Sequence, residues 1–286
     1  MSAISVVGLG RLGLCTAAVF AGAGFDVVGV DLDPGIVAAV NNGTAPFYEP
    51  GLQELLRQVA GRLRATPTYA EAISESDVTF LVVPTPSEPE GHFSDRHLRH
   101  ALTALSRSLR GARKTGHTFV ITSTVSPGTT DARLIPLIES ESGRRLGRSF
   151  DVCYNPEFIA LGSVISDFLH PDLVLIGESN PDAGGRLEEM YRAVCRNRPH
   201  VARMSVVSAE IAKISLNAYV TMKISFANTL AAICEAVPGA DLDAIGKALG
   251  ADKRVSPHAL RGGLPFGGPC FPRDNRAFAA FAEGRG

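Results

Sequence analysis

A cysteine between two prolines is the most reactive group that the sequence presents. Cys270 stands in the stretch Gly267-Gly268-Pro269-Cys270-Phe271-Pro272-Arg273-Asp274. Glycines allow a ligand to approach the backbone closely, and prolines stiffen the frame. A thiol on a rigid, accessible turn beside charged groups is a candidate nucleophile. An isolated cysteine is more often a buried structural residue, so this assignment depends on residues earlier in the chain.

A lysine and an asparagine form the second candidate group. Lys213 and Asn217 are four residues apart, which places them on one face of a helix, with Glu210 three residues before. The stretch 206–237 has no glycine or proline and predicts one long helix, roughly 50 Å at 1.5 Å per residue. It is apolar on several faces, so we expect it to be largely buried. The pair is then either a surface patch of polar residues or a partnered, buried site.

A glycine-rich turn near the start of the chain predicts a nucleotide site. Gly8-x-Gly10-x-x-Gly13 follows a short apolar run and opens an alanine-rich helix, and the next predicted strand ends at Asp31. Gly8 makes the tight turn, Gly10 admits the pyrophosphate, and Gly13 lets helix pack on strand. The helix N-terminus then faces the phosphates. Asp31 would accept a hydrogen bond from a ribose 2′-hydroxyl and would repel a 2′-phosphate. NAD is therefore favoured over NADP.

The elements that position these residues alternate between strand and helix. Predicted strands lie at 4–7, 25–30, 77–83, 118–122, 150–154 and 173–177. This alternation predicts an α/β fold, a doubly wound Rossmann-type parallel sheet, followed by an all-helical domain with the one long central helix. Ligands bind at the carboxyl ends of such strands, where Thr85, Thr124 and Glu157 stand. Glu157 is placed as a general base would be, and each threonine is equally suited to cap a helix.

Composition narrows the class of protein. The 286 residues are 45% hydrophobic and 20% charged, with a formal net charge of -1, which gives no electrostatic case for nucleic acid. No apolar run is long enough to span a bilayer, and the start lacks a charged signal-peptide region. Five scattered cysteines indicate reduced thiols and a cytoplasmic location. We predict two domains, 1–204 for NAD and 205–286 for the helices and the cysteine loop, and we expect no metal site.

These motifs, taken in order, resemble the UDP-glucose/GDP-mannose 6-dehydrogenase family. The stretches that carry the resemblance span nearly the whole chain. They are Gly8-x-Gly10-x-x-Gly13, Tyr48-Glu49-Pro50-Gly51-Leu52, Pro84-Thr85-Pro86, Ser123-Thr124-Val125, Asn155-Pro156-Glu157-Phe158, Glu210-x-x-Lys213-x-x-x-Asn217, Lys223-Ile224-Ser225-Phe226, and Gly267-Gly268-x-Cys270-Phe271-Pro272-x-Asp274. Any one of them alone is weak, whereas the ordered set is specific.

The resemblance implies oxidation of a primary alcohol to a carboxylic acid with two NAD. Cys270 would add to the intermediate aldehyde as a thiohemiacetal, which a second hydride transfer converts to a thioester. An ammonium such as that of Lys213 favours the thiolate, and it could donate with Asn217 to the developing oxyanion. The catalytic residues that the resemblance implies are Cys270, Lys213, Asn217, Asp274, Thr124 and Glu157, the last three of which would order water and pass protons.

The resemblance also implies residues that bind ligands. The cofactor set is Gly8, Gly10, Arg11, Leu12, Gly13, Asp31, Val83, Thr85, Thr124 and Arg273. The substrate set is Glu157, Phe158, Ile159, Lys213, Asn217, Arg254, Phe266 and Gly267. Arg254 matches a family arginine that reaches a substrate phosphate in the neighbouring subunit. We therefore expect a phosphorylated small-molecule substrate and a homodimer built on the long helix 206–237.

The sequence departs from the family at several points. Leu161 replaces a second glutamate that often stands four residues after Glu157, which weakens the case for water activation. Pro269 replaces a serine, Ile36 replaces a basic residue near the cofactor, and Arg273 replaces a lysine. The family typically continues into a second Rossmann-like domain that covers the sugar nucleotide. Because this sequence begins at Met1, we expect a naturally short member.

Three functions stay open at this point. The first is the two-step oxidation of a sugar nucleotide, or of a related sugar phosphate or nucleoside. The second is a two-electron oxidation like that of the β-hydroxyacid dehydrogenases, which use a lysine and an asparagine on a central helix and need no cysteine. The third is an NAD-binding partner protein without catalysis. Cys270 favours the first function, whereas Leu161 and Pro269 favour the second.

Overall fold

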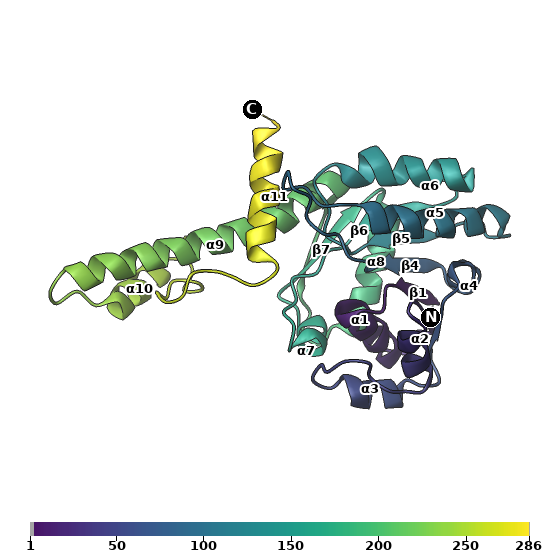
Figure 1. Ribbon diagram of the computed structural model, residues 1–286, viewed down its shortest axis with the longest axis horizontal. Coiled ribbons are helices and arrows are strands. Elements are labelled where there is room, and N and C mark those ends of the chain that lie inside the picture. The colour runs from purple at the N-terminus through teal and green to yellow at the C-terminus, as the bar shows by residue number, and fades with distance from the viewer. Residues whose placement is uncertain (1–2, 286) are drawn as a thin grey trace. The chain divides into compact units, whose positions relative to one another are not determined.

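The computed structural model describes residues 3–285 and divides into two compact units (Figure 1). The sheet unit consists of residues 3–86 and 93–210, and the helical unit consists of residues 87–92 and 211–285. The domain limits 1–204 and 205–286 stay a prediction. The structural division differs from them because it places residues 205–210 with the sheet and residues 87–92 with the helices.

The sheet unit is built on eight strands among the described residues. They are β1 (Ile4–Val7), β2 (Val27–Val30), β3 (Leu63–Thr66), β4 (Val78–Leu81), β5 (Thr118–Ile121), β6 (Asp151–Tyr154), β7 (Leu173–Glu178) and β8 (His200–Ser205). Their order is β3-β2-β1-β4-β5-β6-β7-β8, and every pair is parallel except β6 with β7. The central strands are apolar and buried, as parallel strands covered on both faces must be. The predicted α/β fold is confirmed.

Helices cover both faces of this sheet (Figure 1). They are α1 (Arg11–Gly22), α2 (Pro34–Asn41), α3 (Leu52–Gln58), α4 (Tyr69–Glu75), α5 (Arg96–Gly111), the π-helix η1 (Thr130–Leu134), α6 (Ile135–Ser142), α7 (Val164–Leu169) and α8 (Pro181–Val194). Helices α4, α5 and α6 pack together, and α1 packs with α3 and α7. On the α1 side the core centres on Phe20, whose ring lies 5.0 Å from Phe80 and 5.5 Å from Phe168, centroid to centroid.

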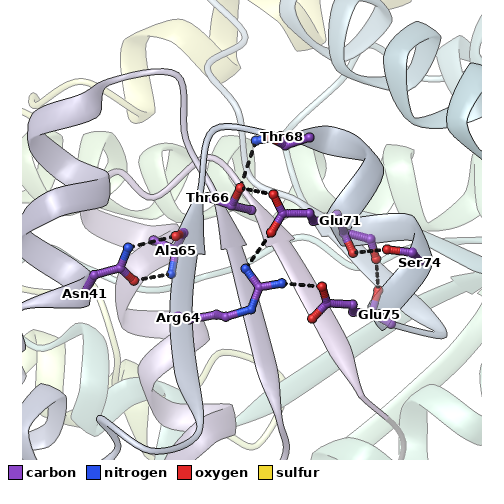
Figure 2. A network of polar contacts seen from close by, with 10 residues as sticks. Asn41, Arg64, Ala65, Thr66, Thr68, Glu71, Ser74 and Glu75 are labelled. Carbon is purple, nitrogen blue, oxygen red and sulfur yellow. Dashed lines mark hydrogen bonds and ion pairs between the residues drawn. The ribbon is translucent and has the colours of Figure 1, made fainter.

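Two strands that the sequence did not predict, β3 and β8, lie at the edges of the sheet. Figure 2 shows how polar side chains hold β3. The Asn41 amide accepts from the Ala65 N–H at 2.7 Å and donates to the Ala65 carbonyl at 2.9 Å. Arg64 bridges Glu71 and Glu75 of α4 at 2.7 and 2.5 Å. The side chains therefore satisfy backbone groups that an edge strand would leave unpaired.

The helical unit is organised on α9 (Val206–Ala236), whose residues from Ile211 onward belong to it, with α10 (Leu242–Gly250) and α11 (Phe271–Glu283). The predicted long helix is confirmed, but the expectation that it is largely buried is wrong. Tyr219, Met222, Phe226 and Ile233 each expose about half of their surface. The reason is that the rest of this unit covers only part of the circumference of the helix, so apolar residues on the remaining face stay in solvent.

Among residues 3–285, no helix is both long enough and apolar enough to cross a membrane. The same residues contain no group of three or more His, Cys, Asp or Glu side chains arranged to hold a metal ion.

Candidate functional site

The glycine turn joins β1 to α1. Gly8 has a φ of +92°, and a Cβ there would collide with the backbone of Val82. A side chain at Gly13 would collide with the carbonyl of Gly8. Gly10, the N-cap of α1, has open space where a Cβ would stand, so packing does not explain this glycine. The free N–H groups that begin α1 are thus open to an anionic ligand.

Asp31 fixes this turn against the end of β2. One oxygen, Oδ2, accepts from the Leu9 N–H at 2.7 Å, and Oδ1 accepts from the Asp33 N–H at 2.9 Å. Gly8, Asp31 and Val83 line one pocket of ≈ 160 Å³ together with the rings of Tyr69, His97 and His100. Burial and the charge of Asp31 raise the pKa of Tyr69, so that phenol stays neutral. The pocket offers a carboxylate and several flat rings to a ligand.

The first two residues of α1, Arg11 and Leu12, differ in exposure. Arg11 is exposed, reaches the Tyr48 carbonyl at 3.4 Å, and lies over the Phe47 ring at 5.6 Å from its centroid. Leu12 packs against the core of the sheet unit. The Arg11 guanidinium therefore lies at the start of α1, where an anionic ligand would bind.

A serine links the loops that follow β4 and β5. The Ser123 hydroxyl accepts from the Val83 N–H at 3.0 Å and lies 2.7 Å from the Val83 carbonyl. Thr85 is buried in the first loop, and Thr124 is half-buried in the second. The two predicted threonines therefore stand on loops that are tied to each other.

The loop after β6 carries Glu157 at the carboxyl end of the parallel strands. The Tyr191 hydroxyl of α8 donates to Asn155 Oδ1 at 2.5 Å and lies 3.1 Å from Glu157 Oε1. Burial, with the nearby charge of Glu157, raises the pKa of Tyr191 well above its usual value, so this hydroxyl acts as a neutral donor. Phe158 and Ile159 are half-buried, and Leu161 is 61% exposed.

In the helical unit, Cys270 is exposed and forms the N-cap of α11. The N-terminus of a helix favours a negative charge on a ligand bound there. One turn later, Asp274 is almost fully buried and accepts from Asn217 Nδ2 at 2.6 Å. Arg273 Nε lies 3.3 Å from the same carboxylate. The structure thus brings Asn217 and Asp274 together beside the cysteine turn.

The remaining predicted residues of this unit lie on α9 and on the connecting loops. Lys213 is buried on α9, one turn before Asn217. Phe266 is half-buried and Gly267 is exposed. The hydrogen bonds of the Arg254 side chain go to Asp252, and their closest approach is 2.6 Å. Arg254 is therefore held in its loop and presented to solvent.

Sequence reasoning did not single out three residues whose side chains hold the loops of the candidate site: Ser123, Tyr191 and Lys223. Lys223 Nζ donates to the Val255 and Ser256 carbonyls at 2.9 and 3.3 Å, which ties the Arg254 loop to α9. Ser123 and Lys223 both lie inside motifs that the sequence shows, so motif membership was the available signal. Tyr191 has no such signal, because it reaches Glu157 from a helix 34 residues away.

Two models of one protein family together match nearly the whole chain. Residues 2–195 match the NAD-binding domain of the UDP-glucose/GDP-mannose dehydrogenase family, and residues 207–286 match its central domain. The predicted NAD cofactor is thereby confirmed.

Individual relatives cover nearly the whole chain. UDP-glucose 6-dehydrogenase AglM of Haloferax volcanii is 42% identical over 99% of this chain and 66% of its own length. UDP-glucose 6-dehydrogenase of Pseudomonas aeruginosa is 36% identical over 99% of this chain and 62% of its own length. This chain therefore spans about two thirds of the length of these relatives.

Solved structures show the same similarity. A UDP-glucose dehydrogenase from Pyrobaculum islandicum superposes with a TM-score of 0.90 at 38% identity, over 100% of this chain and 65% of that protein. A GDP-mannose dehydrogenase from Pseudomonas aeruginosa gives 0.81 at 35% identity, over 98% of this chain and 64% of that protein. The resemblance seen in the motifs is confirmed, and the chain belongs to the UDP-glucose/GDP-mannose dehydrogenase family.

Proposed function

We propose that this chain is an NAD-dependent dehydrogenase that oxidises the primary alcohol of a sugar nucleotide to a carboxylate, with UDP-glucose as the first candidate. The observation that carries the proposal is the cysteine turn. Cys270 is exposed at the start of α11, and Asn217 holds the buried Asp274 one turn away. Relatives named UDP-glucose 6-dehydrogenase at 42% and 36% identity support the choice of substrate.

The chemistry runs in two oxidations. NAD, which the Gly8 turn and Asp31 would hold, would supply the hydride acceptor for each oxidation. Loss of a hydride and of the hydroxyl proton turns the alcohol into an aldehyde. The Cys270 thiolate adds to the aldehyde carbon, and loss of a second hydride converts the thiohemiacetal to a thioester. Water then cleaves the thioester and releases the carboxylic acid and the free thiol. The sum is two NADH for each acid formed.

Each remaining residue has a physical role in this proposal. Lys213 and Asn217 donate hydrogen bonds to the oxygen that becomes negative when the thiolate adds. Glu157, Thr124 and Asp274 order water and accept protons. Arg254, held by Asp252 in an exposed loop, offers a guanidinium to a substrate phosphate.

A second candidate function has one observation in its favour. Leu161 stands where the family often has a second glutamate, and it is 61% exposed, so the loop after β6 lacks a carboxylate in addition to that of Glu157. Without it, thioester hydrolysis has one group fewer to activate water. A dehydrogenase that stops after two electrons, at the aldehyde or ketone, fits this change.

Counting NADH per product tests the two candidates. The chain would be incubated with NAD and a panel of UDP-glucose, GDP-mannose, related sugar nucleotides, sugar phosphates and nucleosides, with products identified by mass spectrometry. Two NADH per acid is the expected result. One NADH per aldehyde would establish the two-electron function, and NAD binding without turnover on any substrate would contradict both.

We further propose that the chain forms a homodimer through α9. Tyr219, Met222, Phe226 and Ile233 recur at helical spacing and are each about half exposed, which leaves an apolar stripe along this helix. Apolar stripes of this kind are normally covered by a partner. A cytoplasmic location is supported by the five cysteines, all of which are unpaired thiols.

A further inference from the structure

Two glutamates of the sheet unit are buried away from any role discussed so far. Glu49 is 4% exposed and Glu210 is 0% exposed. An ionised carboxylate loses its hydration on burial, so it persists inside a protein only where donors replace the water. The donors at both glutamates are backbone N–H groups of distant loops.

Glu49 holds the loop that follows β6, residues 155–164, termed the Glu157 loop. Its Oε1 accepts from the Val164 N–H at 3.0 Å, and its Oε2 accepts from the Gly162 N–H at 3.1 Å. The two bonds cross 113 and 115 residues of sequence. They fix the Glu157 loop directly after Leu161.

Glu210 holds the loop that follows β5, residues 122–130, termed the Thr124 loop. Its Oε2 accepts from the Gly128 N–H at 2.5 Å, and its Oε1 accepts from the Thr130 N–H at 3.0 Å. Burial raises the pKa of Glu210, while the backbone donors oppose that rise. The near end of the same loop is tied by Ser123 to Val83, so both ends of the loop are fixed.

The two contacts solve the same local problem. The Glu157 loop leads into α7 and the Thr124 loop leads into η1, and neither helix has a capping bond from its own N-cap side chain, Ser163 or Thr129. The first N–H groups of a helix have no partner within the helix. A glutamate from elsewhere in the chain supplies an acceptor to the first N–H of each helix, Val164 of α7 and Thr130 of η1. The same glutamates also accept from the Gly162 and Gly128 N–H groups, which lie just before the N-caps.

We propose that Glu49 and Glu210 are positioning residues that hold the Glu157 and Thr124 loops in the geometry that catalysis requires. The proposal rests on the proposed function, since Glu157 and Thr124 act in that reaction. Neither glutamate needs to touch the substrate. Each restricts an irregular loop at the carboxyl edge of the sheet, where misplacement by about 1 Å is costly to catalysis.

Glutamine substitutions test the proposal, because they keep the shape of the side chain and remove the charge. In Glu49→Gln or Glu210→Gln, the amide oxygen accepts from one N–H and the NH₂ group faces the other donor. Hydrogen–deuterium exchange should accelerate about tenfold in peptides of the affected loop only, 157–168 for Glu49 and 124–134 for Glu210. Glu54→Gln on α3 and Glu189→Gln on α8 are the matched controls, since both side chains are exposed.

Kinetics separate a positioning role from a purely structural one. Glu49→Gln should raise KM for the sugar nucleotide about tenfold and leave Kd for NAD within about twofold. Glu210→Gln should lower kcat by about tenfold. Glu49→Asp and Glu210→Asp, which keep the carboxylate, should fall between the wild type and the glutamine variants in both measurements.

Several outcomes would overturn the proposal. Unchanged exchange in the two loops would show that the carboxylates do not hold them. Equally fast exchange in the β1 and β4 peptides, or equal loss of NAD and sugar-nucleotide binding, would assign the glutamates to global folding. If the wild-type chain turns over no sugar nucleotide, the proposed function fails, whereas the exchange data still decide whether the glutamates hold the loops.

Discussion

Candidate residues of the sheet unit are fixed by buried contacts, whereas the helical unit leaves its cysteine and much of its long helix in solvent. Asp31 is held through backbone N–H groups and Glu157 through the Tyr191 hydroxyl. In the helical unit, Cys270 is exposed and Phe226 exposes half of its surface. The difference teaches that the candidate residues of the sheet unit are positioned by contacts within that unit, whereas the proposed nucleophile and one apolar face of α9 have no such cover in the helical unit.

The largest effect should come from replacing the proposed nucleophile, Cys270, and it should not change NAD binding by the sheet unit. Cys270→Ala is expected to lower acid formation by about 10³-fold or more, because the variant lacks the thiol that is proposed to form the thioester. NAD affinity, measured by calorimetry, should stay within about twofold of the wild type. Normal acid output from the variant would show that the cysteine turn is not the chemical centre.

Asp31→Ala should have the opposite effect, because it should weaken NAD binding and leave sugar-nucleotide binding nearly unchanged. Removal of this carboxylate takes away the predicted ribose contact and frees the Leu9 and Asp33 N–H groups. We expect NAD binding to weaken about 100-fold in calorimetry, with sugar-nucleotide binding within about threefold. Unchanged NAD affinity would contradict the predicted contact between the NAD ribose and Asp31, which lines the ≈ 160 Å³ pocket.

Measuring self-association of the wild type and of a variant shows whether a second copy of the chain covers the exposed apolar stripe of α9. Phe226→Ser should weaken self-association about 30-fold, because aromatic anchors at the centre of an interface contribute most to binding. Sedimentation velocity at several concentrations measures the change. Leu264→Ser is the control, since Leu264 is 91% exposed but lies outside α9. A monomeric wild type at all concentrations would refute the dimer.

The smallest effect concerns the amino ends of the interior strands β4 and β5, where buried His117 lies 2.7 Å from the Thr79 hydroxyl through Nε2. Burial, aided by the charges of Lys114 and Arg144, lowers the pKa of His117 to about 3. Since the unfolded value is about 6.5, the unfolded chain binds the proton first as pH falls. The sheet unit should therefore lose about 1.4 kcal/mol of stability per pH unit from this group below about pH 6.5.

Thermal melts between pH 7 and pH 4.5 check the last prediction. His117→Gln, which does not titrate, should flatten this part of the pH dependence, even where it lowers stability at pH 7. An identical slope in both proteins would assign the acid sensitivity to other groups.

Sequence alone determined the features that depend only on residues close together along the chain. The Gly8 turn and Asp31 form a strand–turn–helix–strand unit whose geometry follows from local sterics. The long helix 206–236 was also predictable, because an uninterrupted run without glycine or proline has few alternatives. The order of the motifs was enough to indicate the family, because the motifs are local stretches that can be recognised without the fold.

Only the tertiary structure decided which distant groups meet. Strands β3 and β8 are partly polar, and they form because a neighbouring strand supplies their hydrogen bonds. Glu49 reaches the Glu157 loop across more than 100 residues, a contact that no local pattern encodes. The exposure of α9 was equally hidden, because an apolar face reads the same whether the chain itself or a partner covers it.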